Sequence, residues 1–431
     1  SLINVKNMEN TKLTVLANNL FESCIHLEMV ALSSRIKVIK GHAFEDCHTL
    51  KIPRNFLPSG LTTLEDAAFQ GCYSIERIRI PRNILEIRDY TFKQCSSLIE
   101  VILPDNLKYI GQSAFYHCNS LPDEGINLPD GLETLGVGAF AYCHSFKIIT
   151  IPPSVQKLPS DLFKGCVSLV EASIPDHIVE ISADCFKDCT SIKMVNFPRD
   201  LQVINVGAFR NCTSLGPKEL KFPASLREVR ESAFRYCDSI EKIYISNEIT
   251  KISSAAFEGC RNLKEVIFDH HIEKVDNYAF LDCISLENFP FPLVDRVIGN
   301  AAFCNCKSLN SPTFSETISI INSAAFRGCS SIEILNLPKS LYSVCGASFR
   351  ENSNLKKVII PATVNCIKKS AFRDCINPSD VEIKSSQIYL QARAFKGCEK
   401  LDYIELPQRS SIKADTFENC PAEIVVREDS E

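Results

Sequence analysis

The sequence predicts a solenoid of the α/β repeat class, in which each coil of about 23 residues contributes one short parallel strand and one short helical turn. Three observations support this fold class. The motif Phe-x-x-Cys recurs at a nearly constant interval, and each interval carries the same order of apolar residues. The composition is biased, with 26 Phe, 21 Cys and no Trp, as expected when one short pattern is repeated many times. The 16 Gly compare with about 30 expected at average usage of about 7%.

The Phe-x-x-Cys motif fixes the length of the repeat. Its spacing is 23 residues in thirteen of seventeen steps, 25 after Phe44, Phe115 and Phe209, and 22 before the last copy. An eighteenth unit at Phe349 keeps the frame, with Asn352 in place of Cys. The other seventeen copies begin at Phe21, Phe44, Phe69, Phe92, Phe115, Phe140, Phe163, Phe186, Phe209, Phe234, Phe257, Phe280, Phe303, Phe326, Phe372, Phe395 and Phe417.

The unit that begins at Phe92 shows what each segment of the repeat does. Val101 and Leu103 alternate with Ile102, so the first two point inward and Ile102 outward, as in a short strand. A proline such as Pro104 closes this strand in twelve units, because its missing N–H limits further pairing. A small residue precedes the motif phenylalanine in sixteen of eighteen units, which favours a tight helical turn.

One unit cannot bury its apolar side alone, but stacked units can. Because helical turns are bulkier than strands, we expect a horseshoe or arc with the strands on its concave face, about 80 Å long for strands about 4.8 Å apart. We expect residues 1–431 to form a single solenoid of about 18 repeats, with a truncated first repeat at 1–20 and a terminal strand and acidic end at 421–431. Local irregularity is expected at the four departures from the pattern, Asn55, Pro312, Asn352 and Pro378.

Composition and charge exclude several function classes. With 47 basic and 52 acidic residues, the formal charge is −5, which makes nucleic acid a poor candidate partner. The hydrophobic fraction of 45% is typical of a chain that folds. No stretch approaches the roughly 20 uninterrupted apolar residues of a transmembrane helix, so we expect no transmembrane segment here.

The repeat resembles that of a known family. Residues 95–118 show best the order Cys-x-Ser-Leu-x-x-Ile-x-Ile-Pro, then Leu or Val, Ile-Gly and Ala-Phe-x-x-Cys, which is similar to the BspA-like, or treponemal-type, leucine-rich repeat. The resemblance covers essentially the whole chain. It implies a leucine-rich repeat solenoid and a cell-surface or secreted protein that acts in adhesion by binding host matrix proteins or other cells. The family has no shared catalytic residues, so the resemblance implies no enzyme.

The start of the chain lies inside a repeat. Ser1-Leu2-Ile3-Asn4-Val5 matches the Ser-Leu-x-x-Ile segment of the type unit. We therefore expect the native chain to extend further upstream, so a secretion signal would lie outside this sequence.

The 21 cysteines predict free thiols in preference to disulfides. Seventeen occupy one inward position per coil, where stacked side chains point in parallel and not toward one another. Cys304 falls on the convex turn and is expected to be the exposed thiol, while the exposure of Cys345 and Cys366 stays open. No metal or other cofactor is expected, because neither Cys304-x-Cys306 nor His270-His271 has the paired ligands that zinc requires.

The concave face is the predicted recognition surface. The fold constrains the inward positions and leaves the outward ones, from Phe56 to Glu405, free to vary. Near the carboxyl end, Asp380, Glu382, Asp402 and Glu405 form an acidic zone, and Ser173 extends a polar strip in the middle. The residues predicted to contact a partner are the arginine group Arg54, Arg77, Arg79 and Arg82, the polar residues Thr150 and Asn196, and the apolar pair Tyr244 and Ile267.

The sequence therefore predicts a non-catalytic, monomeric binding protein, whose partner is an extracellular protein or glycan. A rigid array spreads many weak contacts over a large area, which favours macromolecular partners. Two alternatives stay open. The repeats could be a structural spacer that carries another domain, or an intracellular protein-interaction scaffold, which reduced cysteines would also suit.

Overall fold

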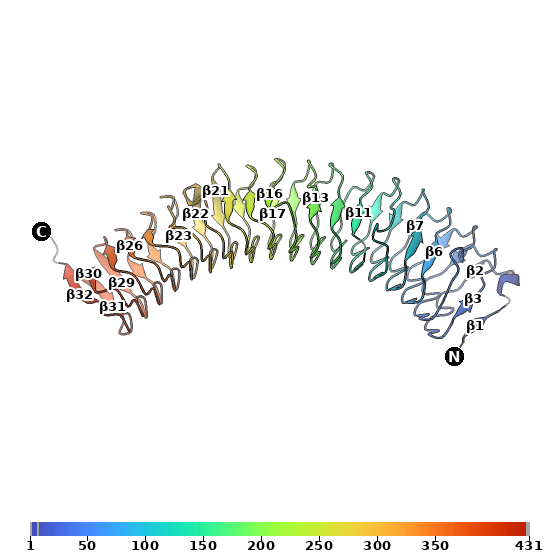
Figure 1. Ribbon diagram of the computed structural model, residues 1–431, viewed down its shortest axis with the longest axis horizontal. Coiled ribbons are helices and arrows are strands. Elements are labelled where there is room, and N and C mark those ends of the chain that lie inside the picture. Colours follow the sequence, from blue (N-terminus) through green and yellow to red (C-terminus); the bar gives the residue numbers. More distant parts are fainter. Residues whose placement is uncertain (1, 7, 146, 428–431) are drawn as a thin grey trace. The chain divides into compact units, whose positions relative to one another are not determined.

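The computed structural model describes residues 2–6, 8–145 and 147–427, and the coils form two compact units, Ser1–Gly216 (unit 1) and Pro217–Glu431 (unit 2). Within each unit, successive coils stack side by side (Figure 1). Each regular coil contains a strand after the motif cysteine, a second strand after the following turn, and a turn segment around the motif phenylalanine. This arrangement confirms the predicted leucine-rich repeat solenoid.

The first strands of the coils pair in parallel to form the first ladder, which is the strand the sequence predicts. In unit 1 the first ladder contains β1 (Asn4–Val5), β3 (Met29–Val30), β6 (Arg77–Arg79), β8 (Glu100–Ile102), β11 (Ile148–Thr150), β12 (Glu171–Ser173) and β14 (Met194–Val195). In unit 2 it contains β16 (Glu219–Lys221), β18 (Lys242–Tyr244), β20 (Glu265–Ile267), β24 (Ile334–Asn336), β26 (Lys357–Ile360), β28 (Asp380–Ile383), β30 (Tyr403–Pro407) and β32 (Glu423–Arg427).

A second strand follows in most coils, and the sequence pattern did not predict it. These strands pair in parallel as the second ladder. In unit 1 they are β2 (Val15–Leu16), β4 (Val38–Ile39), β5 (Thr63–Leu64), β7 (Glu86–Ile87), β9 (Tyr109–Ile110), β10 (Thr134–Leu135), β13 (Glu180–Ile181) and β15 (Val203–Ile204). In unit 2 they are β17 (Glu228–Val229), β19 (Lys251–Ile252), β21 (Ile272–Val275), β22 (Val294–Ile298), β23 (Ile320–Ile321), β25 (Ser343–Val344), β27 (Cys366–Ile367), β29 (Gln387–Leu390) and β31 (Arg409–Ile412).

The segment around each motif phenylalanine is a series of turns, where the sequence predicted a helical turn. The described residues include only two helical elements, the 3-10 helices η1 (Met8–Asn10) and η2 (Phe291–Leu293). Left-handed backbone recurs two residues before and two residues after the phenylalanine, as at His42 and Asp46 around Phe44. This alternation turns every second N–H toward the next coil, so that Phe44 N–H donates to Ala68 O at 2.9 Å. Hydrogen bonds between coils therefore replace those within a helix.

The motif phenylalanines form the core of each unit. Consecutive rings stack with centroids 5.2–6.0 Å apart in unit 1 and 5.3–5.7 Å apart in unit 2. Phe44 and Phe69, for example, are fully buried, with 3° between their ring planes. Such burial is the main stabilising term of the fold, at about 1.5–3 kcal/mol for each phenylalanine. The inward orientation predicted for these rings is confirmed.

Two of the four predicted irregular coils interrupt the first ladder. No first-ladder strand is assigned among described residues 51–57, around Asn55, or at 310–314, around Pro312. Phe56, expected to point outward, is instead buried at 7% exposure, because the chain bends there and its ring packs edge-on against Phe44 and Phe69. The coils of Asn352 and Pro378 keep their ladder strands, β26 and β28.

The last strand of unit 2 is present as the sequence predicts. β32 pairs in parallel with β30. The acidic residues predicted to follow it at 428–431 lie outside the described residues.

Candidate functional site

The face of the first ladder carries the residues predicted to contact a partner. Each strand there places its middle residue in the core and turns its outer residues to solvent, as Ile78 and its neighbours Arg77 and Arg79 do in β6. We call this surface the first-ladder face and treat it separately in the two units.

Glu100 pairs with two of the four arginines in the predicted arginine group of unit 1. It lies in β8 opposite Arg77 of β6, at the same position one coil later. One carboxylate oxygen of Glu100 is 2.5 Å from an Arg54 Nη2, and the other is 4.0 Å from Arg77 Nε. Arg54 and Arg77 therefore share one carboxylate, which offsets one of their two positive charges. The sequence analysis missed this partner, although the 23-residue interval from Arg77 to Glu100 was a usable signal.

The other two arginines of the group remain available. Arg79 and Arg82 are exposed, and neither forms an ion pair within the described part of the chain. Both line a hollow at the end of β6, and three asparagines and Asp105 line it too. The asparagines are Asn55, Asn83 and Asn106. Two guanidinium groups beside amide donors suit a carboxylate, a sulfate or an acidic protein surface.

The two predicted polar residues of unit 1 differ in their availability. Thr150 ends β11, is exposed, and lies opposite Ser173 of β12. Asn196 follows β14, and its side-chain amide pairs with the backbone of Ile174 in both directions, at 3.1 Å each. The Asn196 side chain thus replaces a missing ladder contact. Because its oxygen and nitrogen both bond the backbone of Ile174, they are not available to a partner.

Tyr244 and Ile267 lie side by side in unit 2, as predicted. They are register partners on β18 and β20, and both are half-buried. Lys221, the register partner of Tyr244 on β16, places its Nζ 4.8 Å from the centre of the Tyr244 ring. A cation and an apolar pair therefore occupy consecutive strands.

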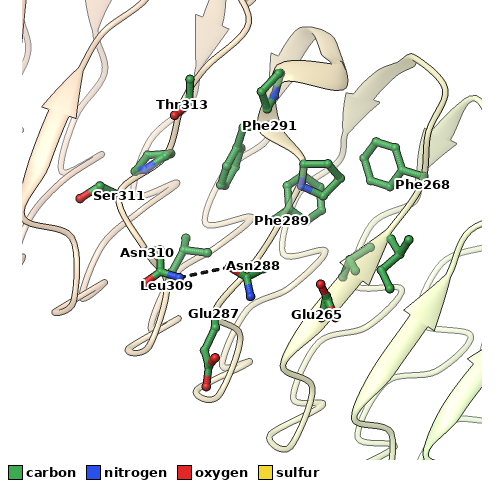
Figure 2. A pocket seen from close by; sticks show the side chains of 15 residues that line it. Glu265, Phe268, Glu287, Asn288, Phe289, Phe291, Leu309, Asn310, Ser311 and Thr313 are labelled. Atoms are coloured by element: carbon green, nitrogen blue, oxygen red, sulfur yellow. Dashed lines mark hydrogen bonds between the residues drawn. The ribbon is translucent and has the colours of Figure 1, made fainter.

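Next to Ile267 the face is hollowed where the first ladder is interrupted (Figure 2). Figure 2 shows Phe268, Phe289 and Phe291 at one end of the hollow and carboxylate and amide side chains at the other. The sequence analysis flagged Pro312 as a departure but did not predict a hollow. The available signal was the sequence Phe-Pro-Phe-Pro at 289–292, which cannot form a regular ladder strand.

The predicted acidic zone of unit 2 is largely paired. An oxygen of the Asp380 carboxylate lies 2.5 Å from Lys357 Nζ, and one of Glu382 lies 3.5 Å from Lys384 Nζ. An oxygen of the Glu405 carboxylate lies 3.7 Å from Arg427 Nε. The net negative charge of this zone is consequently small.

The cysteines correct one prediction. Cys304 is buried at 8% exposure, and burial raises the pKa of its thiol to about 11. It is buried because the turn segment packs against the neighbouring coil, whose Asp282 N–H donates to Cys304 O. All 21 cysteines are free, and Cys345 and Cys366 are half-buried on the second ladder. Among the described residues, no group of three or more His, Cys, Asp or Glu side chains could hold a metal ion.

A membrane-spanning helix is not found either. Within residues 2–6, 8–145 and 147–427, the chain forms no helix with the length and apolar character needed to cross a bilayer.

The chain matches a family by sequence. A protein-family model described as a BspA type leucine rich repeat region of six copies matches residues 14–123, 121–216, 205–309 and 296–423. These matches cover far more than half of the chain and confirm the resemblance drawn from residues 95–118. No curated protein matches the sequence significantly.

Solved structures are similar as well. A leucine-rich repeat protein from Bacteroides ovatus matches with a TM-score of 0.62 and 23% identity, over 99% of this chain and 92% of that one. A leucine rich repeat protein from T. pallidum is 30% identical over 39% of this chain and 77% of that one, with a TM-score of 0.35. A leucine rich cell surface protein from Faecalibacterium prausnitzii is 21% identical over 81% of this chain and 83% of that one, with a TM-score of 0.40. The first match supports the fold.

Proposed function

Because the chain belongs to the BspA-type leucine-rich repeat family, we propose that it is a non-catalytic binding protein, displayed at the cell surface or secreted. The first-ladder face recognises a protein or glycan partner. The observation that carries this proposal is the contrast between inward and outward positions. The inward ones repeat from coil to coil, whereas the outward ones vary. They include Arg79 and Arg82, which form no ion pair with any described residue, and the apolar pair of Tyr244 and Ile267.

The scaffold suits this role physically. Ladder hydrogen bonds and stacked rings hold the outward side chains in place before any partner binds. Binding then costs little ordering of the backbone, and many modest contacts can add up over several coils. The described hollows are open to solvent, which favours a macromolecular partner over a small molecule enclosed in a deep pocket.

A binding survey tests the proposal. The purified protein is measured against arrayed extracellular matrix proteins and glycans, and positive partners are titrated for saturation. For an acidic partner, Arg79→Glu combined with Arg82→Glu is expected to weaken binding about tenfold or more at low salt, with a smaller effect at high salt. Arg88→Glu, beside β7 of the second ladder, makes the same kind of charge reversal at one residue away from the first-ladder face and should leave binding unchanged.

The proposal fails if no arrayed partner binds the purified protein saturably. If a partner binds the double arginine variant and the Arg88→Glu variant with equal affinity, the recognition surface lies elsewhere and Arg79 and Arg82 do not contact the partner.

A second candidate is an intracellular interaction scaffold, which the 21 free thiols favour because reducing compartments keep thiols reduced. Locating the full-length protein in its native cells separates the two. Surface labelling of intact cells supports the first candidate, and labelling only after cell lysis supports the second.

A further inference from the structure

The first ladder of unit 2 contains a local defect. Regular pairing ends after β20 and resumes at β24, and two isolated bridges span the interval, Glu265 with Asn288 and Thr313 with Asn336. The second ladder continues through the same coils, because β21, β22 and β23 pair without a break in order. The second ladder shows only a register shift between Ile272 and Lys274, so the loss of pairing is confined to the first-ladder face.

Pro290 explains the defect. It occupies the outward position held by Tyr244 and Ile267 in the two preceding coils, and proline has no N–H to donate to the strand before it. The chain then turns into η2 instead of continuing as a strand. Pro312 removes a second ladder donor one coil later.

The defect leaves a backbone donor of the preceding coil unused. In regular coils the residue after the strand donates its N–H to the next coil, as Ile245 does to Ile267 O at 2.9 Å and Leu337 to Ile359 O at 3.1 Å. Phe268 holds the position of Ile245 one coil later, and its N–H donates to no acceptor among the described residues. Phe268 is one of the residues that line the hollow.

The two ends of the hollow differ in chemistry (Figure 2). At the aromatic end, Phe289 packs against Phe268 and Phe291, with ring centroids 5.7 and 4.9 Å apart. At the polar end, Asn310 Nδ2 donates to Asn288 Oδ1 at 3.1 Å. The hollow thus offers apolar contact and polar contact a short distance apart.

The polar end also carries an unpaired negative charge. Glu265 forms an ion pair with Lys242, with 3.2 Å between the carboxylate oxygen and Nζ. The nearby Lys264 forms an ion pair with Glu241, with 3.0 Å between Nζ and the carboxylate oxygen. Glu287 is exposed and has no cation within ion-pair distance in the described part of the chain. A ligand with a positive group would complement this carboxylate.

We propose that the hollow between β20 and β24 binds a short extended peptide segment of a protein partner. An apolar side chain of that peptide lies at the aromatic end, and a Lys or Arg two residues away pairs with Glu287. A backbone carbonyl of the peptide accepts the free N–H of Phe268, as in the addition of a strand to a sheet. This unused strand donor favours a peptide over a glycan. The inference rests on the proposed function and specifies its partner in unit 2.

Synthetic peptides test the inference. The probes are acetylated and amidated hexapeptides that carry Phe or Leu at one position and Lys, Ala or Glu two residues later, measured by fluorescence polarisation. We expect Lys peptides to bind at least tenfold more tightly than Glu peptides at low salt, with a smaller difference at high salt. Methylating the peptide nitrogens one at a time, and replacing amides by esters, should reveal whether the peptide backbone contributes.

Matched variants locate the site. Thr313→Trp fills the hollow from an exposed position and should abolish binding, whereas Asn336→Trp, at the equivalent position one coil later, should not. Glu287→Lys should reverse the preference for Lys peptides, and Glu333→Lys, two coils later at the equivalent position, should not. Circular dichroism of each variant confirms that it folds.

Three outcomes would overturn the inference. The first is that Lys and Glu peptides bind equally tightly. The second is that the Thr313→Trp variant binds peptides as tightly as the wild type. The third is that no peptide binds, while an arrayed glycan binds the wild type and not the Thr313→Trp variant. In each case saturable binding elsewhere on the first-ladder face would leave the proposed function standing, so the two failures are distinguishable.

Discussion

The cysteine of each coil does more than fill space. In most coils its thiol donates to the carbonyl of the motif phenylalanine one coil earlier, as Cys72 does to Phe44 O at 3.0 Å and Cys375 to Phe349 O at 3.0 Å. The buried carbonyl, which at Phe44 also accepts the Cys47 N–H at 3.2 Å, thereby gains a second donor that alanine could not supply. Burial also raises the pKa of these thiols, to about 12 for Cys47. They therefore stay protonated and able to donate.

Asn352 is the exception, and it predicts a stabilising substitution. The residue is fully buried, and neither its Oδ1 nor its Nδ2 has a hydrogen-bond partner within the described chain. An unsatisfied buried polar group costs about 1–3 kcal/mol, so Asn352→Cys should raise the free energy of unfolding by a similar amount. Urea unfolding of the two proteins measures it.

The reverse change is the control for Asn352. Cys329, one coil earlier, donates to Phe303 O at 3.0 Å, so Cys329→Asn should destabilise by about the same 1–3 kcal/mol. Equal stability of all three proteins would mean that the thiol contact has no energetic role.

Gly259 predicts a destabilising substitution. Its φ of +70° is left-handed, and an added Cβ would collide with the ring of Tyr236 in the preceding coil. That ring cannot easily move, because Arg235 donates to its hydroxyl at 3.0 Å and lies 4.8 Å from its centre. Gly259→Ala should therefore cost about 1–3 kcal/mol in unfolding free energy, measured in urea.

Two further proteins resolve this cost into its parts. Tyr236→Ala combined with Gly259→Ala removes the collision and should leave only the backbone strain of about 1–2 kcal/mol between the double variant and Tyr236→Ala alone. Gly131→Ala, whose added Cβ would have its nearest neighbour at 3.6 Å, should change stability by less than about 0.5 kcal/mol. A neutral Gly259→Ala would contradict the assigned turn geometry.

At the scale of the elements, period-two alternation made the first ladder predictable. Arg77-Ile78-Arg79 alternates visibly, and the spacing of the copies sets its register. The second ladder was missed because strands such as Glu86–Ile87 are two residues long, which is too short to show any period. Pairing with the neighbouring coils creates them. The turn segment kept its predicted place but not its helical form, since its N–H groups bond to the next coil.

The candidate site was predictable only in part, for a similar reason. Outward residues such as Arg79 and Tyr244 could be placed from strand periodicity alone. Their partners could not, because the pairing of Arg77 with Glu100 depends on which rotamers meet across coils. The hollow beside Ile267 depends on how the chain bends at Pro290, which strand periodicity does not describe.

Ion pairs between coils predict a pH dependence. Glu241 lies between Lys218 Nζ at 2.6 Å and Lys264 Nζ at 3.0 Å, and hydrogen bonds from these lysines lower the pKa of the carboxyl from 4.5 to about 2. A lowered pKa in the folded state contributes stability above the unfolded value, and the contribution is lost as pH falls from about 4.5 to about 2. The stability difference between wild type and Glu241→Gln should therefore shrink over this window.

Thermal unfolding at pH 5, 4, 3 and 2 measures the dependence at low salt. Glu248→Gln serves as the control, because Glu248 is exposed and forms no ion pair within the described residues. Its difference from wild type should stay flat where that of Glu241→Gln shrinks. If the stability difference from wild type depends on pH in the same way for both variants, Glu241 does not form these ion pairs with the lysines in solution. High salt should reduce the effect, since the two lysines are exposed.

Each whole unit buries its thiols coil by coil, because the motif cysteines other than Cys24 and Cys420 are buried against the neighbouring coil. Seventeen of the 21 cysteines, all within the described residues, are buried. The four half-buried ones are Cys24, Cys345, Cys366 and Cys420. Nearest-neighbour stacking of this kind makes thiol exposure a direct measure of local uncoiling.

A thiol-reactive dye should therefore label at most four cysteines in the native protein and all 21 after unfolding in guanidinium under non-oxidising conditions. Labelling follows access and thiolate fraction, and the buried thiols have neither. Cys304→Ser should leave the native count unchanged because Cys304 is buried, whereas Cys345→Ser should lower it by one if Cys345 reacts. Labelling of Cys304 at the rate of a free thiol would show that the turn segment opens in solution. A count well below 21 after unfolding would instead reveal disulfides.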